Sequence, residues 1–195
     1  MSSSERISEL FNSSIKVIQD SGSELIPYIN AAAETITQAL FNEKKLLVCG
    51  NGGSASIAQL FSSNMVNRFE VERPGLPVIN INSDAAVLTS IANDSQFADV
   101  FAKQIRALGQ EGDILLAITI SGESHNIIHV IDAAHDRNMQ VIVLTGCDGG
   151  QIADLMREQD IEIRVTSWAY PRIYELHLLI IHCICDLIDH YLLGQ

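Results

Sequence analysis

One stretch decides the fold: Leu46-Leu47-Val48-Cys49-Gly50-Asn51-Gly52-Gly53-Ser54, in which four apolar residues run directly into a glycine-rich turn. The residues after Ser54 follow a helical pattern, so the stretch predicts a buried strand, a tight turn and the beginning of a helix. Free backbone N–H groups and the positive end of the helix dipole at such a turn favour a phosphate. The stretch therefore predicts an anion site together with a fold.

The rest of the chain repeats this alternation of strand and helix. Apolar runs predict strands at 46–49, 77–81, 114–118, 141–145 and 161–165, and helices are expected at 54–69, 85–93, 97–108, 125–138 and 150–156. Most of the strands are continuously apolar, which is typical of strands buried on both faces. We therefore expect an α/β fold with a five-stranded parallel sheet, doubly wound in the flavodoxin-like manner, and helices on both of its faces.

Helical patterns also flank this alternating region. Two N-terminal helices are expected within residues 1–43, separated at Asp20-Ser21-Gly22-Ser23, and a long final helix is expected at about 170–192. We interpret residues 1–195 as a single domain, with 1–43 as a helical pair for oligomerisation and 44–195 as the α/β core and last helix. The last helix is apolar on more than one side, which favours burial in a core or an interface.

Composition excludes several classes of protein. The chain has 12 Lys and Arg against 24 Asp and Glu, a formal net charge of −12, so direct binding to DNA is not expected. No uninterrupted apolar run reaches the roughly 20 residues of a membrane span, and no signal pattern opens the chain, so we expect a cytoplasmic protein without a membrane. The four cysteines lie in apolar contexts, as buried thiols do.

A second loop has the character of the first. Ser121-Gly122-Glu123-Ser124 follows the strand at 114–118 and precedes a helix, and ligands of such sheets bind beyond the carboxyl ends of the strands. Hydroxyls from Ser54, Thr119, Ser121 and Ser124 would cradle a phosphate monoester, although Glu123 would weaken it unless its side chain points away. The alternative interpretation is that both loops are ordinary strand-to-helix turns with N-capping serines.

Taken with Leu144-Thr145-Gly146-Cys147-Asp148-Gly149-Gly150, the two loops resemble the sugar isomerase (SIS) domain family over nearly the whole chain. That resemblance implies a homotetramer and a phosphosugar pocket. The residues that we expect to bind a phosphosugar are Asn51, Gly52, Gly53, Ser54, Asp84, Asn93, Asp94, Thr119, Ser121 and Ser124.

Within this family, the length fits phosphoheptose isomerases, which interconvert sedoheptulose 7-phosphate and a heptose phosphate. The resemblance implies that these isomerases hold zinc with a histidine, a glutamate that is also the general base, a glutamine and a second histidine. The matching positions here are Leu60, Asn64, Tyr174 and His182. Leucine offers no donor and an amide is no carboxylate base, so we expect no catalytic residue at Asn64 or His182, no metal and no cofactor.

The length also fits DiaA-like proteins, which are non-enzymatic tetramers that bind the replication initiator DnaA. Segments 65–74, 87–94 and 183–189 resemble that group. The sequence therefore favours a non-catalytic scaffold that binds DnaA and promotes assembly of the initiation complex, with Leu192 and Leu193 as partner contacts. The alternatives are a phosphoheptose isomerase of lipopolysaccharide heptose biosynthesis and a regulator that responds to a sugar phosphate.

Overall fold

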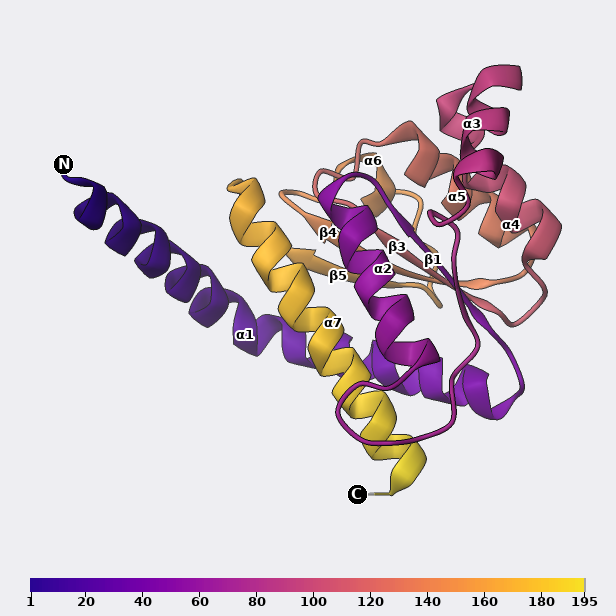
Figure 1. Cartoon of the computed structure of the whole chain (residues 1–195), viewed down its shortest axis with the longest axis horizontal. Helices are drawn as coiled ribbons and strands as arrows, with labels where there is room; N and C mark the ends of the chain where they lie inside the picture. Colours follow the sequence, from indigo (N-terminus) through magenta and orange to yellow (C-terminus); the bar gives the residue numbers. More distant parts are fainter. Residues whose placement is uncertain (195) are drawn as a thin grey trace.

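The computed structural model describes residues 1–194 and has the predicted α/β architecture (Figure 1). Its strands are β1 (Leu46–Gly50), β2 (Val78–Asn80), β3 (Ile114–Ile118), β4 (Gln140–Gly146) and β5 (Ile161–Val165). Its helices are α1 (Ser3–Phe41), α2 (Gly53–Val66), α3 (Ala85–Asp94), the 3-10 helix η1 (Phe97–Asp99), α4 (Ala102–Leu108), α5 (His125–Asp136), α6 (Gly150–Ala153) and α7 (Tyr170–Leu193).

The five strands form one parallel sheet in the order β2-β1-β3-β4-β5. From β1 the chain crosses to the edge strand β2, and from there it returns to the other side of β1 to make β3. The connections after β1 and β3 thus leave the sheet in opposite directions, and a crevice opens between them at the carboxyl ends of the two strands. This switch point is where a ligand site is expected.

Each face of the sheet carries its own apolar core. One core joins alternate residues of the strands to α1, α2 and α7, with Phe61 and Ile184 among its fully buried members. The other joins the remaining strand residues to α4, α5 and α6, around Phe101 and Ile131, and α3 packs against it. The continuously apolar strands are buried on both faces, as their composition predicts.

The N-terminal region differs from the prediction, because residues 3–41 form one continuous helix and not a pair. The polar stretch at 20–23 costs about 1 kcal/mol of helix propensity for Gly22 and less for its neighbours. Packing offsets that cost, since Ser21 and Leu25 are buried and α1 lies along α7 and β5. The helix even continues through Pro27, a residue that usually ends or kinks a helix.

Several smaller elements also differ from the prediction. The helix expected at 97–108 is divided into η1 and α4, the one expected at 150–156 ends at Ala153, and the one expected at 54–69 ends at Val66. The strand expected at 77–81 keeps only three residues, as is common for an edge strand. None of these changes alters the order of the strands or moves the switch point.

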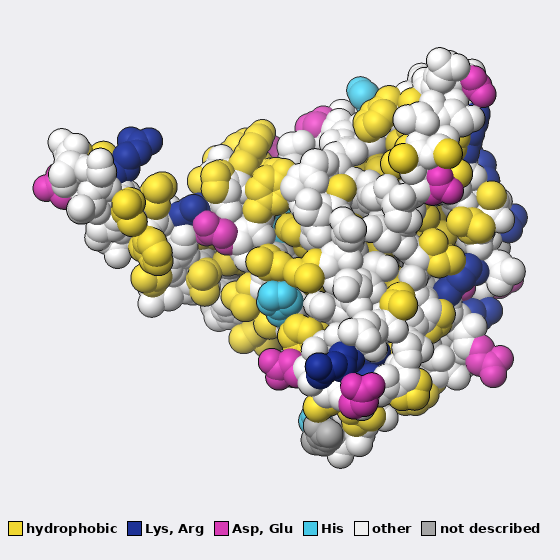
Figure 2. All heavy atoms as spheres, in the orientation of Figure 1, with side chains coloured by type: hydrophobic (Ala, Val, Ile, Leu, Met, Phe, Trp, Pro, Cys, Tyr) yellow, Lys and Arg dark blue, Asp and Glu magenta, His cyan; other side chains and the backbone are white. Residues whose placement is uncertain are grey.

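The N-terminal half of α1 extends away from the rest of the molecule as an arm (Figures 1 and 2). Apolar side chains at helical spacing are exposed along this arm, and Figure 2 shows them as a yellow band. The exposed members are Ile7, Leu10, Phe11, Ile15 and Ile18. A stripe of this kind is typical of a helix face that is covered by another chain.

Helix α7 is long and apolar enough to cross a membrane by length and composition alone. In the structure its buried side packs against α1, α2 and the sheet, and carries the polar residues Arg172, His177 and Asp189. We therefore assign α7 to the core of the fold.

Buried His177 predicts a loss of stability in acid. Its Nε2 donates to the carbonyl of Thr145 at 2.9 Å, and Nδ1 has no hydrogen-bond partner. Burial lowers the pKa of His177 to about 4, although the Thr145 hydrogen bond opposes this shift. Between the ordinary pKa of 6.5 and 4 the unfolded chain binds a proton that the folded chain excludes. We expect His177 to account for a loss of about 3 kcal/mol of unfolding free energy as the pH falls through this window.

Urea unfolding at pH 7 and pH 4.5 checks this expectation. His177→Leu should show a smaller drop in unfolding free energy than the wild type, whatever its absolute stability. The exposed His125→Leu is the control and should keep the wild-type drop. An equal drop in wild type and His177→Leu would show that the imidazole does not contribute.

Candidate functional site

A cavity of about 190 Å³ occupies the switch point between β1 and β3. It brings together five of the predicted phosphosugar-binding residues, namely Asn51, Ser54, Thr119, Ser121 and Ser124. Ile120, Tyr170 and Tyr174 complete the lining. The hydroxyls and amides that the sequence places on two separate loops therefore face a single space.

Two asparagines fix the loop after β1. The amide of Asn82 accepts from the Gly50 N–H at 3.1 Å and donates to the Gly50 carbonyl at 2.8 Å. The side chains of Asn51 and Asn126 exchange two hydrogen bonds of 2.8 Å, which join this loop to α5. Neither Asn82 nor Asn126 is among the predicted binding residues, although Asn82 follows a strand and Asn126 follows a turn at the carboxyl ends of the strands.

The helices that begin at the cavity both lack a side-chain N-cap bond. Gly52 has no side chain to offer to α2, and the hydroxyl of Ser124 makes no capping bond to α5. First-turn N–H groups at a helix start need partners, which caps, water or ligands provide. Two uncapped helix starts at one polar cavity are the arrangement that favours an anion. The alternative interpretation of ordinary turns with N-capping serines does not fit these two helix starts, because neither has a side-chain cap bond.

The loop after β3 turns its carboxylate away from the cavity. Glu123 accepts from the backbone N–H of Gln151 at 3.2 Å and from its side-chain amide, at the beginning of α6. The loop can pass this close to α6 because residue 122 is a glycine with φ of +71°, and a Cβ there would lie 1.8 Å from the Gly149 carbonyl oxygen. The carboxylate of Glu123 is therefore hydrogen-bonded to Gln151 and does not line the cavity.

The other five predicted binding residues are not among those that line the cavity. Asp84 is the N-cap of α3 and accepts from the Val87 N–H at 3.0 Å. Asn93 donates to Asp94 at 2.9 Å on the exposed end of the same helix. Gly52 and Gly53 contribute backbone at the start of α2. Within one subunit, no residue of α3 lines the cavity.

The residues at the four zinc positions do not fit a zinc ion. Leu60 and Asn64 follow each other by one turn of α2, and Asn64 Nδ2 lies 3.9 Å from the Cys185 Sγ. Tyr174 and His182 are eight residues apart on α7, about 12 Å of helix rise. The His182 ring packs against Phe69, with ring centroids 5.6 Å apart. One imidazole, an amide, a phenol and a leucine are a poor donor set, and residues 1–194 contain no cluster of three His, Cys, Asp or Glu side chains suited to a metal.

Below Asn64, a buried arginine joins α2 to α7. Arg73 pairs with Asp189, and its guanidinium also donates to the carbonyls of Asn64, Met65 and Pro74. Both side chains of the ion pair are almost fully buried. The arginine thus binds the end of α2 that is remote from the cavity.

The cysteines behave as the sequence predicts. All four are free thiols; Cys49, Cys147 and Cys185 are buried and Cys183 is half-buried. Burial raises the pKa of the Cys185 thiol to about 12, and burial raises the pKa of Cys49 further. Neutral thiols of this kind are neither nucleophiles nor metal ligands at neutral pH.

The two leucines predicted as partner contacts lie at the end of α7. Leu192 packs partly buried against the core and Leu193 is exposed, and their role as partner contacts stays a prediction. The hydroxyl of Tyr191 donates to Asn30 on α1 at 2.7 Å, which holds the last turn in place.

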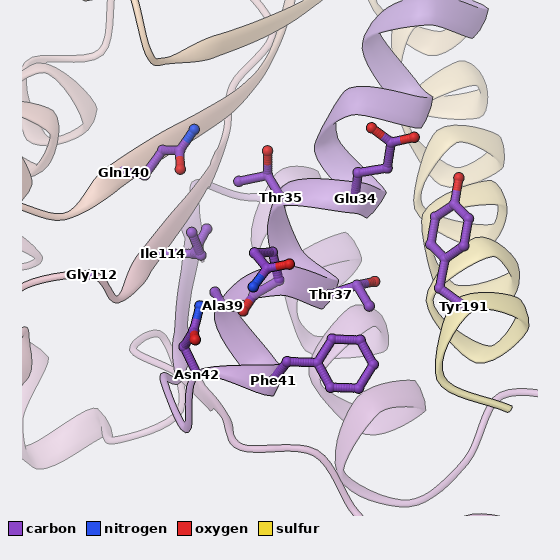
Figure 3. Close-up of a pocket in the computed structure, with 11 residues that line it drawn as sticks. Glu34, Thr35, Thr37, Ala39, Phe41, Asn42, Gly112, Ile114, Gln140 and Tyr191 are labelled. Atoms are coloured by element: carbon purple, nitrogen blue, oxygen red, sulfur yellow. Dashed lines mark hydrogen bonds between the residues drawn. The ribbon is translucent and has the colours of Figure 1, made fainter. Parts of the chain in front are cut away.

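A larger cavity of about 660 Å³ lies at the other edge of the sheet (Figure 3). Figure 3 shows Glu34 and Phe41 from α1 and its C-cap Asn42 on the lining, with Gln140 at the start of β4 and Tyr191 from α7. Ligands of doubly wound sheets bind at the carboxyl ends of the strands, and this cavity is at the amino ends. The smaller cavity at the switch point is therefore the candidate site in spite of its size.

Comparison with known proteins places this geometry in a family. The profile of the SIS domain matches residues 10–146. A phosphoheptose isomerase of Halorhodospira halophila is 52% identical over 194 residues, which cover all of this chain and 98% of that protein. The structure of a phosphoheptose isomerase from Francisella tularensis is similar with a TM-score of 0.95 and 46% identity, covering 97% of this chain and 100% of the other. That from Neisseria gonorrhoeae has a TM-score of 0.92 and 42% identity, covering 96% and 99%.

These relatives correct the functional prediction. The expected scaffold that binds DnaA is wrong, because relatives that share about half of their residues with this chain over its full length are phosphoheptose isomerases. The prediction gave four residue positions more weight than the similarity of the remaining chain. The isomerase alternative is the interpretation that the relatives support.

Proposed function

We propose, from the premise that this chain belongs to the SIS domain family, that it is a phosphoheptose isomerase. It would be a cytoplasmic aldose–ketose isomerase that converts sedoheptulose 7-phosphate to D-glycero-D-manno-heptose 7-phosphate. The observation that carries the proposal is the polar cavity between the uncapped starts of α2 and α5, in a fold shared with isomerases that are 42–46% identical.

The phosphate of the sugar would be bound without a cationic side chain. No Lys or Arg is among the residues that line the cavity. The dianion would accept from first-turn N–H groups of the two helices and from the hydroxyls of Ser54, Thr119, Ser121 and Ser124. The two helix dipoles add positive potential at the same place.

Isomerisation moves a proton between adjacent carbon atoms, which requires a general base. Because the zinc positions do not fit a metal, we expect turnover of sedoheptulose 7-phosphate to be unchanged, within twofold, after treatment with a chelator. The assay follows conversion of the sugar phosphate by NMR, before and after chelation and with added zinc. Loss of activity with the chelator and recovery with zinc would show that the protein does bind a catalytic zinc ion.

The same experiment separates binding from chemistry. Calorimetric titration of the sugar phosphate measures binding, and the NMR assay measures conversion. Binding with conversion supports the whole proposal. Binding without conversion would overturn the isomerase and leave a sugar-phosphate-binding protein, and the absence of binding would overturn both.

We also propose that the chain is a homotetramer, built through the exposed stripe on the α1 arm. The stripe residues leave apolar surface in water that a second copy would bury, at roughly 1.5–3 kcal/mol for each large side chain. Leu10→Asp with Phe11→Asp should therefore shift the sedimentation of the protein at micromolar concentration to smaller species.

The matched control for the arm is Lys16→Glu. At 100° per residue, Lys16 lies on the side of α1 opposite to the stripe, so its substitution should leave the sedimentation coefficient unchanged. A monomeric wild type, or a double variant that sediments as the wild type does, would contradict assembly through this stripe.

A further inference from the structure

Two tyrosines form one wall of the candidate site. Tyr170 and Tyr174 are one turn apart at the beginning of α7, so they lie on the same side of that helix. Both line the cavity whose other lining residues carry hydroxyls and amides, together with Ile120. The site therefore has a polar wall from β1 and β3 and an aromatic wall from α7.

Tyr174 lies directly against the predicted phosphate position. A Cβ placed on Gly53 would come within 2.7 Å of the Tyr174 Cζ and 3.0 Å of its hydroxyl oxygen. The ring thus contacts the backbone where α2 begins, and a glycine at 53 is the residue that permits this contact. Tyr170 is 50% exposed and stands at the rim of the cavity.

The lining of the cavity indicates how a ligand would lie. The cavity has a volume of about 190 Å³, and Tyr170 and Tyr174 are the aromatic part of its lining. A sugar phosphate whose phosphate lies at the helix starts would place its carbon chain in the same space as the two rings. Aromatic faces bind apolar surface, and the C–H face of a sugar is surface of this kind.

We propose that Tyr170 and Tyr174 form a stacking wall that binds the carbon skeleton of the sugar and so distinguishes a sugar phosphate from inorganic phosphate. This inference rests on the proposed function of the cavity. It assigns affinity for the phosphate to the polar wall and preference for the sugar to the aromatic wall.

The test compares two ligands, sedoheptulose 7-phosphate and inorganic phosphate, by calorimetric titration. Tyr174→Leu and Tyr170→Ala should each lower affinity for the sugar phosphate by about tenfold and change affinity for inorganic phosphate by less than about twofold. Tyr174→Phe keeps the ring and should stay within about threefold of the wild type. Tyr28→Ala is the matched control, because Tyr28 is an exposed tyrosine on α1 outside the cavity.

Trp168 offers a second measurement. It is the one tryptophan of the sequence, is 73% exposed and precedes Tyr170 by two residues, so its fluorescence should respond to the sugar phosphate. Wild-type binding with unchanged affinity in Tyr174→Leu and Tyr170→Ala would overturn the wall and leave the proposed function intact. An equal loss in Tyr174→Phe and Tyr174→Leu would assign the effect to the hydroxyl and also overturn it. Failure of the wild type to bind sedoheptulose 7-phosphate would overturn both proposals.

Discussion

Ser124→Asp is expected to weaken the binding of sedoheptulose 7-phosphate by roughly 100-fold. Ser124 lines the cavity and is the N-cap of α5, so the new carboxylate would lie beside the phosphate. Two like charges about 4 Å apart repel by several kcal/mol at an effective dielectric near 20, and a net cost of about 3 kcal/mol gives this factor. Calorimetric titration of wild type and variant provides the measurement.

The position allows an unusually clean control. Asp, Asn and Ser are about equally good N-caps, so neither Ser124→Asp nor Ser124→Asn should destabilise α5. Ser124→Asn has nearly the same shape as Ser124→Asp without the charge, and its affinity should stay within about fivefold of the wild type. If the two variants lose affinity equally, or if neither does, an anion does not bind at this helix start.

Arg73→Met is expected to lower the unfolding free energy by about 3–5 kcal/mol. The substitution leaves Asp189 charged, buried and without its partner, and it removes the donors to three backbone carbonyls. Asp189 Oδ2 already has no hydrogen-bond partner, so the carboxylate has little other stabilisation. For a chain of this length, the melting temperature should fall by about 10 °C, which calorimetry or urea unfolding can follow.

Two further variants test the explanation. The double substitution Arg73→Met with Asp189→Leu removes both charges and should recover at least half of the loss, because apolar replacement of a whole buried pair is often nearly neutral. Arg68→Met breaks an exposed pair with Glu72, at 3.6 Å, and should change stability by less than about 0.5 kcal/mol. A loss below 1 kcal/mol for Arg73→Met would show that water or another group replaces the guanidinium.

The fold could be predicted because most of its strands are buried on both faces. Ile114–Ile118 was predicted with its observed bounds, since a continuous apolar run between turns has few alternatives, and Ile161–Val165 was predicted with its observed bounds from an alternation of apolar and charged residues. The single helix α1 could not be predicted, because the burial of Ser21 and Leu25 depends on the packing of α1 along α7 and β5, which lie far away in the sequence. Helix ends such as Ala153 depend in the same way on local packing.

The polar half of the site was predictable and the aromatic half was not. Asn51, Ser54 and Ser121 lie on loops that the sheet topology must bring together. Tyr170 and Tyr174 come from the end of the chain, and their approach to the cavity depends on how α7 packs on α2. The function was mispredicted because the substitutions at Leu60 and Asn64 were read as decisive against the isomerase.

The length of α2 separates two properties within one structural element. Ser54 lines the cavity at the switch point, whereas Leu60 and Asn64 follow it by six and ten residues, about 9 and 15 Å of helix rise. Substitutions at Leu60 and Asn64 therefore leave the residues that line the cavity unchanged. In a protein of this fold, the chemistry done on a ligand can change independently of the cavity that holds it.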